Sequence, residues 1–306
     1  MTSAAVSAPG TPGHARTRKI WMDGSLVNPA EARVSVYDHG LLYGDGVFEG
    51  LRAYGGRVFK LDSHLKRLEA SAACIRLAIP YTRAQLAQAV RDTVAACGMP
   101  DCYIRLVVTR GPGSLGLNPF SCPRAGVVVI ADTIQLYPHE LYRTGMKVIV
   151  AKRPRIPIEC LDPAIKSLNY LNNVLAKCEA IDAGVLEAIM LNLDGEVSEC
   201  TGDNIFAIKG SVISTPPTSA GILHGITRQF VIDDLAPAVD MTVEERPMRL
   251  EEHYAADEVF LTGTAAEIIG VSAIGDRTIG AGCMGPASKR LEAEFRRRIQ
   301  AGPPED

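Results

Sequence analysis

The sequence predicts two α+β domains, and three observations lead to this fold class. The chain has 306 residues, enough for one large domain or two compact ones. Strand-like and helix-like segments are mixed in both halves, without the regular alternation of a doubly wound sheet. A loosely patterned stretch separates the halves. The expected division is a disordered tail at 1–18, a small N-terminal α/β domain at 19–131, an interdomain linker at 132–145 and a larger C-terminal domain at 146–306.

The N-terminal half combines short strands with two helices. One helix begins at Asp62 or Ser63, both common helix caps. The other opens with a capping box formed by Thr82 and Gln85. A loop rich in Gly and Pro, residues 110–124, lies between the last two strands of this half. The strands themselves are expected at 19–22, 33–37, 102–109 and 126–131.

The C-terminal half is expected to hold two hairpins between helices. Asp194-Gly195 is a strong hairpin dipeptide, and a second hairpin turns near Lys209-Gly210. Helices are predicted from Ser167 to about Ala183, just after Gly225, and over about 286–299. The apolar face of the first of these helices is expected to be Leu168, Leu171, Leu175 and Cys178.

Composition narrows the function classes. A formal net charge of -3 does not indicate a binder of nucleic acid or of anionic membranes. The chain contains no run of 18 apolar residues, so no membrane span is predicted. The N-terminus lacks the apolar core of a signal peptide. The eight cysteines are scattered, without CxxC or nearby histidines at ligand spacing. We therefore expect reduced thiols, a cytoplasmic location and no metal site.

Lys166 is the first candidate for chemistry, because it directly precedes a predicted apolar helix. The dipole at a helix start disfavours a protonated amine and so favours a nucleophilic one. Taken alone, a solvent-exposed lysine at the edge of a loop is the more frequent interpretation.

Three further segments contain groups that suit an anionic heterocycle. The helix start at Gly225 and Thr227 offers free N–H groups and a hydroxyl to an anion. The small residues of 262–268, TGTAAEI, follow a strand and are able to line a phosphate pocket. Glu199 on a hairpin strand is able to hold a ring nitrogen in its protonated form. A capped helix, a tight turn and a half-exposed strand residue are the respective alternatives.

Tyr103 and Arg105 belong to a strand with clear alternation. They share one face, while Ile104, Leu106 and Val108 share the other. Since the apolar face packs into a core, the arginine points into a different space, where its planar fork is able to bind a carboxylate. An edge-exposed arginine is the equally frequent alternative.

Five motifs in sequence order resemble the class IV, or fold type IV, pyridoxal-phosphate-dependent aminotransferases, most closely their branched-chain amino acid branch. The resemblance extends from Trp21 to about Arg298. It implies a two-domain α+β fold with pyridoxal 5'-phosphate in the interdomain cleft. The motifs are VYDHGLLYGDGVFEGLR (36–52), IKSLNYLNNVLAKCEA (165–180), VSECTGDNIF (197–206), LHGITR (223–228) and TGTAAEI (262–268).

The resemblance implies a role for each matching residue at the cofactor. Lys166 would form the Schiff base and shuttle the proton between substrate Cα and the cofactor. Glu199 would pair with the pyridine nitrogen, which preserves the electron sink. Tyr170 would contact the phenolic oxygen, and Leu223 would pack on the ring. The phosphate would be held by Arg67, Gly225, Ile226, Thr227 and Thr264.

The resemblance also implies the substrate-binding residues. The α-carboxylate would bind Tyr103 and the backbone of Thr264 and Ala265. The distal carboxylate of glutamate would bind Tyr43 and Arg105. Phe48 would line the apolar pocket, together with Tyr137, which is assigned from spacing alone. The implied reaction transfers an amino group from leucine, isoleucine or valine to 2-oxoglutarate. A homodimer or larger assembly is also implied, in which the loop near 110–123 closes over the partner's site.

The alternatives within this family are a D-amino acid or (R)-amine transaminase and, as the weakest, an aminodeoxychorismate lyase. The spacing from Lys166 to Asn169 is shared with the D-amino acid enzymes. Those enzymes use a basic pair in the following loop, whereas GPGSLGLNPF (111–120) contains no Arg or His. This difference and the YIR strand favour the branched-chain branch. A non-catalytic carrier on the same fold is a further alternative. It would need neither Lys166 nor Glu199, so the presence of both argues against it.

Overall fold

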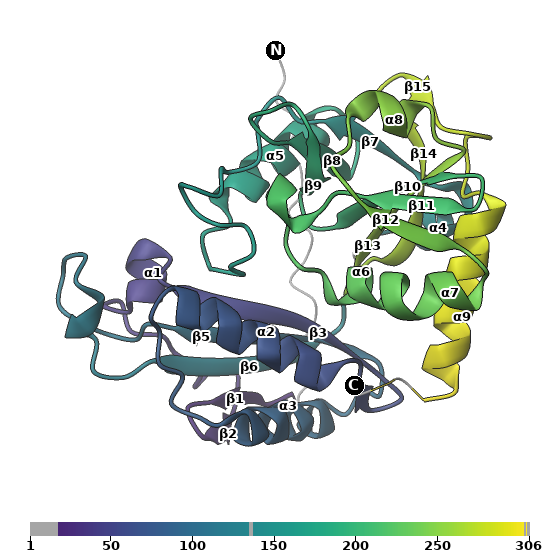
Figure 1. Ribbon diagram of the computed structural model, residues 1–306. Helices are drawn as coiled ribbons and strands as arrows, with labels where there is room; N and C mark the ends of the chain where they lie inside the picture. Colours follow the sequence, from purple (N-terminus) through teal and green to yellow (C-terminus); the bar gives the residue numbers. More distant parts are fainter. Residues whose placement is uncertain (1–17, 135–136, 303, 305–306) are drawn as a thin grey trace, which may run out of the picture.

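The computed structural model describes residues 18–134, 137–302 and 304 (Figure 1). It contains two β-sheets of unequal size. The smaller sheet lies below the larger one in the view, and each has its own layer of helices. This mixed architecture confirms the predicted α+β class. The predicted disordered tail lies outside the described residues, apart from Arg18, which pairs with Asp132.

The smaller sheet is antiparallel, with six strands in the order β2-β1-β6-β5-β3-β4. Its buried face packs against α2 (Leu61–Cys74) and α3 (Arg83–Cys97). Along β5, Ile104, Leu106 and Val108 are fully buried in that core, so the other face of the strand is turned away from it. The strands are β1 (Ile20–Met22), β2 (Ser25–Val27), β3 (Gly46–Tyr54), β4 (Arg57–Val58), β5 (Cys102–Thr109) and β6 (Gly126–Asp132).

The larger sheet has nine strands in the order β12-β11-β10-β13-β14-β7-β8-β9, with β15 also on β14. It is mixed, because β11–β12, β14–β7 and β7–β8 are parallel pairs and the others are antiparallel. The strands are β7 (Met146–Val150), β8 (Glu187–Leu191), β9 (Val197–Cys200), β10 (Asn204–Lys209), β11 (Val212–Thr215), β12 (Thr242–Glu245), β13 (Glu258–Gly263), β14 (Glu267–Ile274) and β15 (Arg277–Thr278). Both predicted hairpins, β8–β9 and β10–β11, are present.

Helices and one aromatic cluster connect the two sheets. Phe59, just after β4, packs edge-to-face against Phe230 and Phe295 of the larger unit.

The remaining helices are α1 (His39–Tyr43), α4 (His139–Thr144), α5 (Leu171–Asp182), α6 (Ile226–Phe230), the π-helix η3 (Val231–Leu235), α7 (Ala236–Ala238), α8 (Leu250–Tyr254) and α9 (Pro286–Gln300), with short 3₁₀ turns η1 (Pro119–Ser121) and η2 (Thr218–Ala220). Within the described residues, no helix has the length and apolar character needed to span a bilayer.

Three local predictions need comment. Residues 33–37 form no strand, because β1 pairs instead with Ser25–Val27 across the Asp23-Gly24 turn. The predicted linker contains α4, which packs on β14. The sheets occupy residues 20–132 and 146–278, but the domain boundaries themselves stay a prediction.

The helix predicted from Ser167 begins later, and the part of its predicted apolar face that lies on α5 is exposed. The helix α5 begins at Leu171, and its buried positions are Asn173, Ala176 and Ala180. Leu171 is 67% exposed, and the apolar stripe that it begins faces away from the core of its own chain. Periodicity identifies a face but does not say what covers it.

Candidate active site

Lys166 lies on an extended segment beside β3, not at a helix start. The Lys166 carbonyl accepts a hydrogen bond from Phe48 N at 2.9 Å, and Leu168 N donates to Gly46 O at 2.9 Å. The helix-dipole argument for Lys166 is therefore wrong, because α5 begins five residues later. Strand-like pairing fixes the lysine instead, and its Nζ lies 3.2 Å from the Tyr170 hydroxyl and 4.7 Å from the centre of the Phe48 ring.

Two cavities meet at Lys166. The larger, about 380 Å³, is lined from both sheets; the smaller, about 50 Å³, lies mainly within the larger unit. Among the predicted residues, the larger cavity is lined by Phe48, Tyr103, Arg105, Lys166, Tyr170, Thr264 and Ala265. The smaller is lined by Arg67, Lys166, Glu199, Leu223, Gly225, Ile226, Thr227 and Thr264. The structure thus brings together residues that are up to about two hundred positions apart in the chain.

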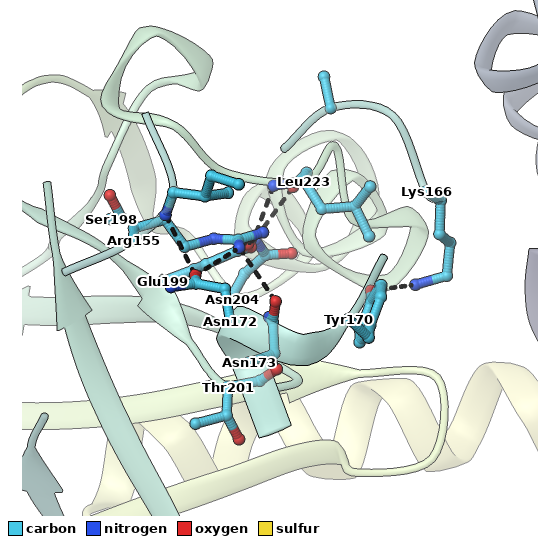
Figure 2. A network of polar contacts seen from close by, with 12 residues as sticks. Arg155, Lys166, Tyr170, Asn172, Asn173, Ser198, Glu199, Thr201, Asn204 and Leu223 are labelled. Atoms are coloured by element: carbon cyan, nitrogen blue, oxygen red, sulfur yellow. Dashed lines mark hydrogen bonds and ion pairs between the residues drawn. The ribbon is translucent and has the colours of Figure 1, made fainter. Parts of the chain in front are cut away.

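Glu199 on β9 is one of two acidic residues that line the smaller cavity, with Asp203, and lies opposite Lys166 and Tyr170 in Figure 2. One carboxylate oxygen pairs with the Arg155 guanidinium at 2.9 Å. The other accepts from Asn204 Nδ2 at 3.1 Å and from Leu223 N at 3.0 Å. Burial raises the pKa of Glu199, although Arg155 and the Leu223 amide act in the opposite direction. A cationic ring nitrogen beside this carboxylate would offset the cost of its burial.

Arg155 is a site residue that the sequence interpretation missed. It is 6% exposed and also donates to Asn173 Oδ1 on α5 at 3.1 Å. Its segment, KRPRIP, has no periodicity that separates one arginine from the others. The one available clue is that a buried carboxylate needs a cation, and that clue names no particular residue.

Arg67 on α2 is held as a fixed cation in the lining of the smaller cavity. Its Nε and Nη2 donate to the two oxygens of Glu49 at 2.8 and 2.7 Å, and Nη1 donates to His224 O at 2.5 Å. Burial alone would raise the pKa of Glu49, but Arg67 and His64 hold it well below its usual value. Glu49, on β3, was not predicted.

Gly225 allows the close approach that brings the start of α6 to the cavity. A Cβ at this position would lie 2.0 Å from Asn204 Oδ1, so a larger residue would displace either the helix or the amide. Thr262 also lines this cavity, and its buried hydroxyl has no hydrogen-bond partner among the described residues. This hydroxyl is therefore able to hydrogen-bond to a polar group bound in the cavity.

The larger cavity combines an apolar wall with the Arg105 guanidinium, in addition to Lys166. The Arg105 guanidinium stacks over the Phe48 ring at 4.5 Å and donates to the Tyr103 hydroxyl at 3.0 Å. These contacts hold its fork in place at the cavity while its charge stays available to a ligand. Gly50 keeps this wall open, because a Cβ there would lie 2.2 Å from the Tyr103 hydroxyl.

Two predicted tyrosines lie outside the cavity linings. Tyr43, on α1, is 36% exposed and accepts from Gly116 N at 2.9 Å, which ties α1 to the 110–124 loop. Tyr137 is buried, and its hydroxyl donates to Asp203 Oδ2 at 2.7 Å. It reaches the cavities only through Asp203, which lines both. Burial, with the nearby Glu187 carboxylate, raises the pKa of Asp203 to about 7.

Comparison with known protein families identifies the enzyme class to which this fold belongs. Residues 46–274 match the family described as amino-transferase class IV. The chain belongs to the class IV aminotransferases.

Two relatives illustrate the similarity of the chain to branched-chain amino acid aminotransferases. The chain is 39% identical over 282 residues to the branched-chain-amino-acid aminotransferase of Pseudomonas aeruginosa, covering 90% of this chain and 91% of the relative. It is 47% identical over 278 residues to a Methanocaldococcus jannaschii protein whose name assigns it provisionally to the same activity, covering 91% and 95%.

Solved structures show the same fold. An Escherichia coli branched-chain amino acid aminotransferase superimposes with a TM-score of 0.89 and 34% identity, over 92% of this chain and 94% of that one. The branched-chain aminotransferase of the thermophilic archaeon Thermoproteus uzoniensis, solved with norvaline, gives a TM-score of 0.85 and 39% identity, over 94% and 96%. Another branched-chain amino acid aminotransferase, solved with pyridoxamine 5'-phosphate, gives a TM-score of 0.89 and 37% identity, over 95% and 96%. These matches confirm the predicted fold type IV architecture.

Proposed function

We propose that this chain is a pyridoxal-phosphate-dependent aminotransferase for branched-chain L-amino acids. It would transfer the amino group of leucine, isoleucine or valine to 2-oxoglutarate, giving a branched 2-oxo acid and L-glutamate. The observation that carries the proposal is the position of the Lys166 amine at the junction of a small polar cavity and a larger one with an apolar wall. The names of the relatives support the same substrate class.

The smaller cavity fits a phosphorylated pyridine. Arg67, Thr227 and Thr264 offer a guanidinium and hydroxyls to a phosphate, and the start of α6 offers backbone N–H groups. Glu199 offers a carboxylate to the ring nitrogen. The unpartnered Thr262 hydroxyl is a further donor for a bound polar group. A phosphate dianion beside the Arg67 cation and a protonated nitrogen beside the Glu199 carboxylate would match these charges.

Side chains of this chain would have distinct roles around bound pyridoxal phosphate. When bound, pyridoxal phosphate supplies an electron sink for negative charge at the substrate Cα. Lys166 would hold the cofactor covalently and then move the proton at Cα, with its amine placed by the Tyr170 hydroxyl. Glu199 would keep the ring nitrogen protonated, and Arg155 would keep Glu199 ionised. Phe48 and Leu168 would exclude water from the apolar side.

The larger cavity suits two unlike side chains in turn. Phe48 and Leu168 provide an apolar surface for a branched aliphatic group. Arg105 provides a cation for the distal carboxylate of glutamate, and it lies on the same cavity without interrupting the apolar wall. Tyr103 and the Thr264–Ala265 turn would receive the α-carboxylate that all of these substrates share.

We further propose a homodimer or a larger homo-oligomer, because two exposed apolar surfaces lie beside the site. On α1 and the adjoining loop, Leu41, Leu115 and Leu117 are 64%, 71% and 82% exposed. On α5, the stripe of exposed apolar side chains consists of Leu171, Val174, Leu175, Cys178 and Ile181. Apolar patches of this kind usually mark protein–protein contacts. The eight unpaired cysteines support a cytoplasmic location.

A substrate panel tests the proposal. The purified protein is supplied with pyridoxal phosphate and assayed with L-leucine, L-valine, D-alanine and an (R)-arylamine, each with a suitable 2-oxo acid. We expect L-leucine with 2-oxoglutarate to be used fastest. The variant Lys166→Ala should lose nearly all turnover, while Lys147→Ala, an exposed lysine on β7, should keep it. Faster turnover of D-alanine than of L-leucine would overturn the substrate class, and full activity of Lys166→Ala would overturn the site.

A further inference from the structure

The hairpin that carries Thr264 and Ala265 contains a backbone position that rarely holds a side chain. β13 and β14 are joined by three residues, after which Glu267 pairs with Gly263. Glu267 has φ of 58°, in the left-handed region, where hairpins with three-residue loops usually place glycine. A residue with a side chain adopts this backbone conformation only when the surrounding contacts hold it there, and such residues are frequent at functional sites.

The Glu267 side chain explains why the backbone is held in this way. It is 3% exposed, and its carboxylate is surrounded by donors from two other elements. One oxygen accepts from the Tyr54 hydroxyl at 2.7 Å and pairs with Arg52 at 3.1 Å, both on β3 of the smaller sheet. The other oxygen pairs with Arg296 of α9. Burial and the Glu267 charge raise the pKa of Tyr54 well above its usual value, so this phenol remains a donor.

Arg52 connects the same strand to the turn itself. Its Nη1 donates to Ala265 O at 3.3 Å, directly beside its contact with Glu267. Phe48 and Gly50 lie earlier on β3 and line the larger cavity, and Thr264 and Ala265 line it from the other side. The two walls of the cavity belong to different sheets: β3 carries one, and the β13–β14 hairpin carries the other. The Glu267 carboxylate lies on the hairpin and contacts β3, so it links the two walls.

We propose that Glu267 is a positioning residue that sets the separation between the Thr264–Ala265 turn and β3, and through it the affinity of the site for the substrate α-carboxylate. Glu267 does not line the cavity, so it acts through the turn rather than by touching the substrate. The proposal rests on the proposed function in one respect: it takes the larger cavity as the amino acid site.

Three variants of the holoenzyme test this role. Glu267→Gln keeps the size of the side chain and removes its charge. Glu267→Gly removes the side chain but suits the left-handed backbone, so it should fold even if the glutamine variant does not. Glu292→Gln is the matched control, because Glu292 pairs with Arg296 at 2.9 Å from within α9, outside both the turn and β3. Each is assayed with the amino acid that the wild-type enzyme uses best, and backbone amide exchange is measured over residues 262–268.

We expect both Glu267 variants to raise KM for the amino acid by about tenfold or more, with kcat changed by less than about threefold, and to speed amide exchange in the turn. Glu292→Gln should change none of these. A wild-type KM in Glu267→Gly, or a rise in KM that merely follows loss of cofactor or of Tm, would overturn the role of Glu267. The substrate class is decided separately, by which amino acid the wild-type enzyme prefers, so failure of one proposal does not imply failure of the other.

Discussion

Glu199 and Asp203 are four residues apart, and their buried carboxyl groups have different partners. Glu199 has a guanidinium, a side-chain amide and a backbone N–H around it. Asp203 has the Tyr137 hydroxyl and a second carboxyl group, Glu187, whose Oε2 lies 3.2 Å from the same hydroxyl. A neighbouring cation favours the charged form of a buried carboxyl group, whereas a neighbouring carboxylate raises its pKa, as it does for Asp203. The two residues are therefore suited to different tasks.

Glu199→Gln tests the first of these carboxylates. The amide keeps the size of the side chain but no longer stabilises a protonated ring nitrogen. We expect cofactor to remain bound, while single-turnover deprotonation of the amino acid slows by about 10²-fold, a loss of roughly 3 kcal/mol of charge stabilisation. Unchanged single-turnover rates would show that Glu199 does not control that nitrogen.

Asp203→Asn tests the second carboxylate through the pH dependence of stability. The pKa of Asp203 is about 7 in the folded chain, above the value of 3.8 expected when unfolded, so its ionisation opposes folding. The contribution of Asp203 to wild-type stability should therefore be full below about pH 4 and be lost as the pH rises towards 7. The asparagine variant removes this penalty and is expected to gain roughly 2–4 kcal/mol relative to wild type at pH 8, and little at pH 4. Denaturant unfolding at both pH values checks this, and a gain equal at both would contradict it.

At the scale of single elements, the alternation of β5 separates packing from binding. Its buried positions, such as Ile104 and Leu106, are fully enclosed in the core of the smaller sheet. Tyr103 and Arg105 occupy the opposite face and line the larger cavity. A substitution on this second face should therefore alter substrate binding with little effect on the core.

Arg105→Ala tests which carboxylate this strand binds. If Arg105 serves the distal carboxylate, kcat/KM for L-glutamate should fall by roughly 2–4 kcal/mol, while L-leucine suffers less. Steady-state kinetics with both amino acids give the comparison, and Val107→Ala, half-buried on the same face, serves as a control for the strand. Equal losses for both substrates would mean that Arg105 binds the shared α-carboxylate instead.

At the scale of the whole molecule, the exposed stripe of α5 predicts self-association. Figure 1 places α5 in the larger unit, far from the outer strand β2 of the smaller one. Leu171 and Val174 are 67% and 51% exposed, so charging either should not disturb the core of the chain. Leu171→Glu is expected to dissociate the assembly and reduce activity, since a buried unpaired charge at an interface costs several kcal/mol.

Sedimentation velocity distinguishes the outcomes. Leu26→Glu on β2, where the wild-type leucine is 40% exposed, is the matched control and should leave the assembly intact. A wild-type chain that is monomeric and fully active would remove the proposed assembly. In that case the stripe on α5 would have no explanation from packing.

Local order in the sequence was enough to predict the mixed fold class and both hairpins, whereas the lysine segment was predicted from the resemblance of residues 165–180 to a known family. Capping at Thr82, the Asp194-Gly195 turn and the alternation of 102–109 involve neighbours within a few residues, where spacing alone determines geometry. The five motifs contain most of the predicted residues that the structure gathers around two cavities, although Arg67, Tyr103 and Arg105 lie outside these motifs. Their roles at a cofactor remain predictions for the experiments above.

Tertiary structure alone decided which partners complete the site. Arg155 reaches Glu199 across 44 residues, and Tyr54 reaches Glu267 across 213, distances in sequence over which no local pattern is informative. It also decided that α5 turns Ala176 and Ala180, rather than its larger apolar residues, towards its own core. The physical reason is common to all three cases: side-chain spacing fixes the face of an element, but only packing of the whole chain determines what that face meets.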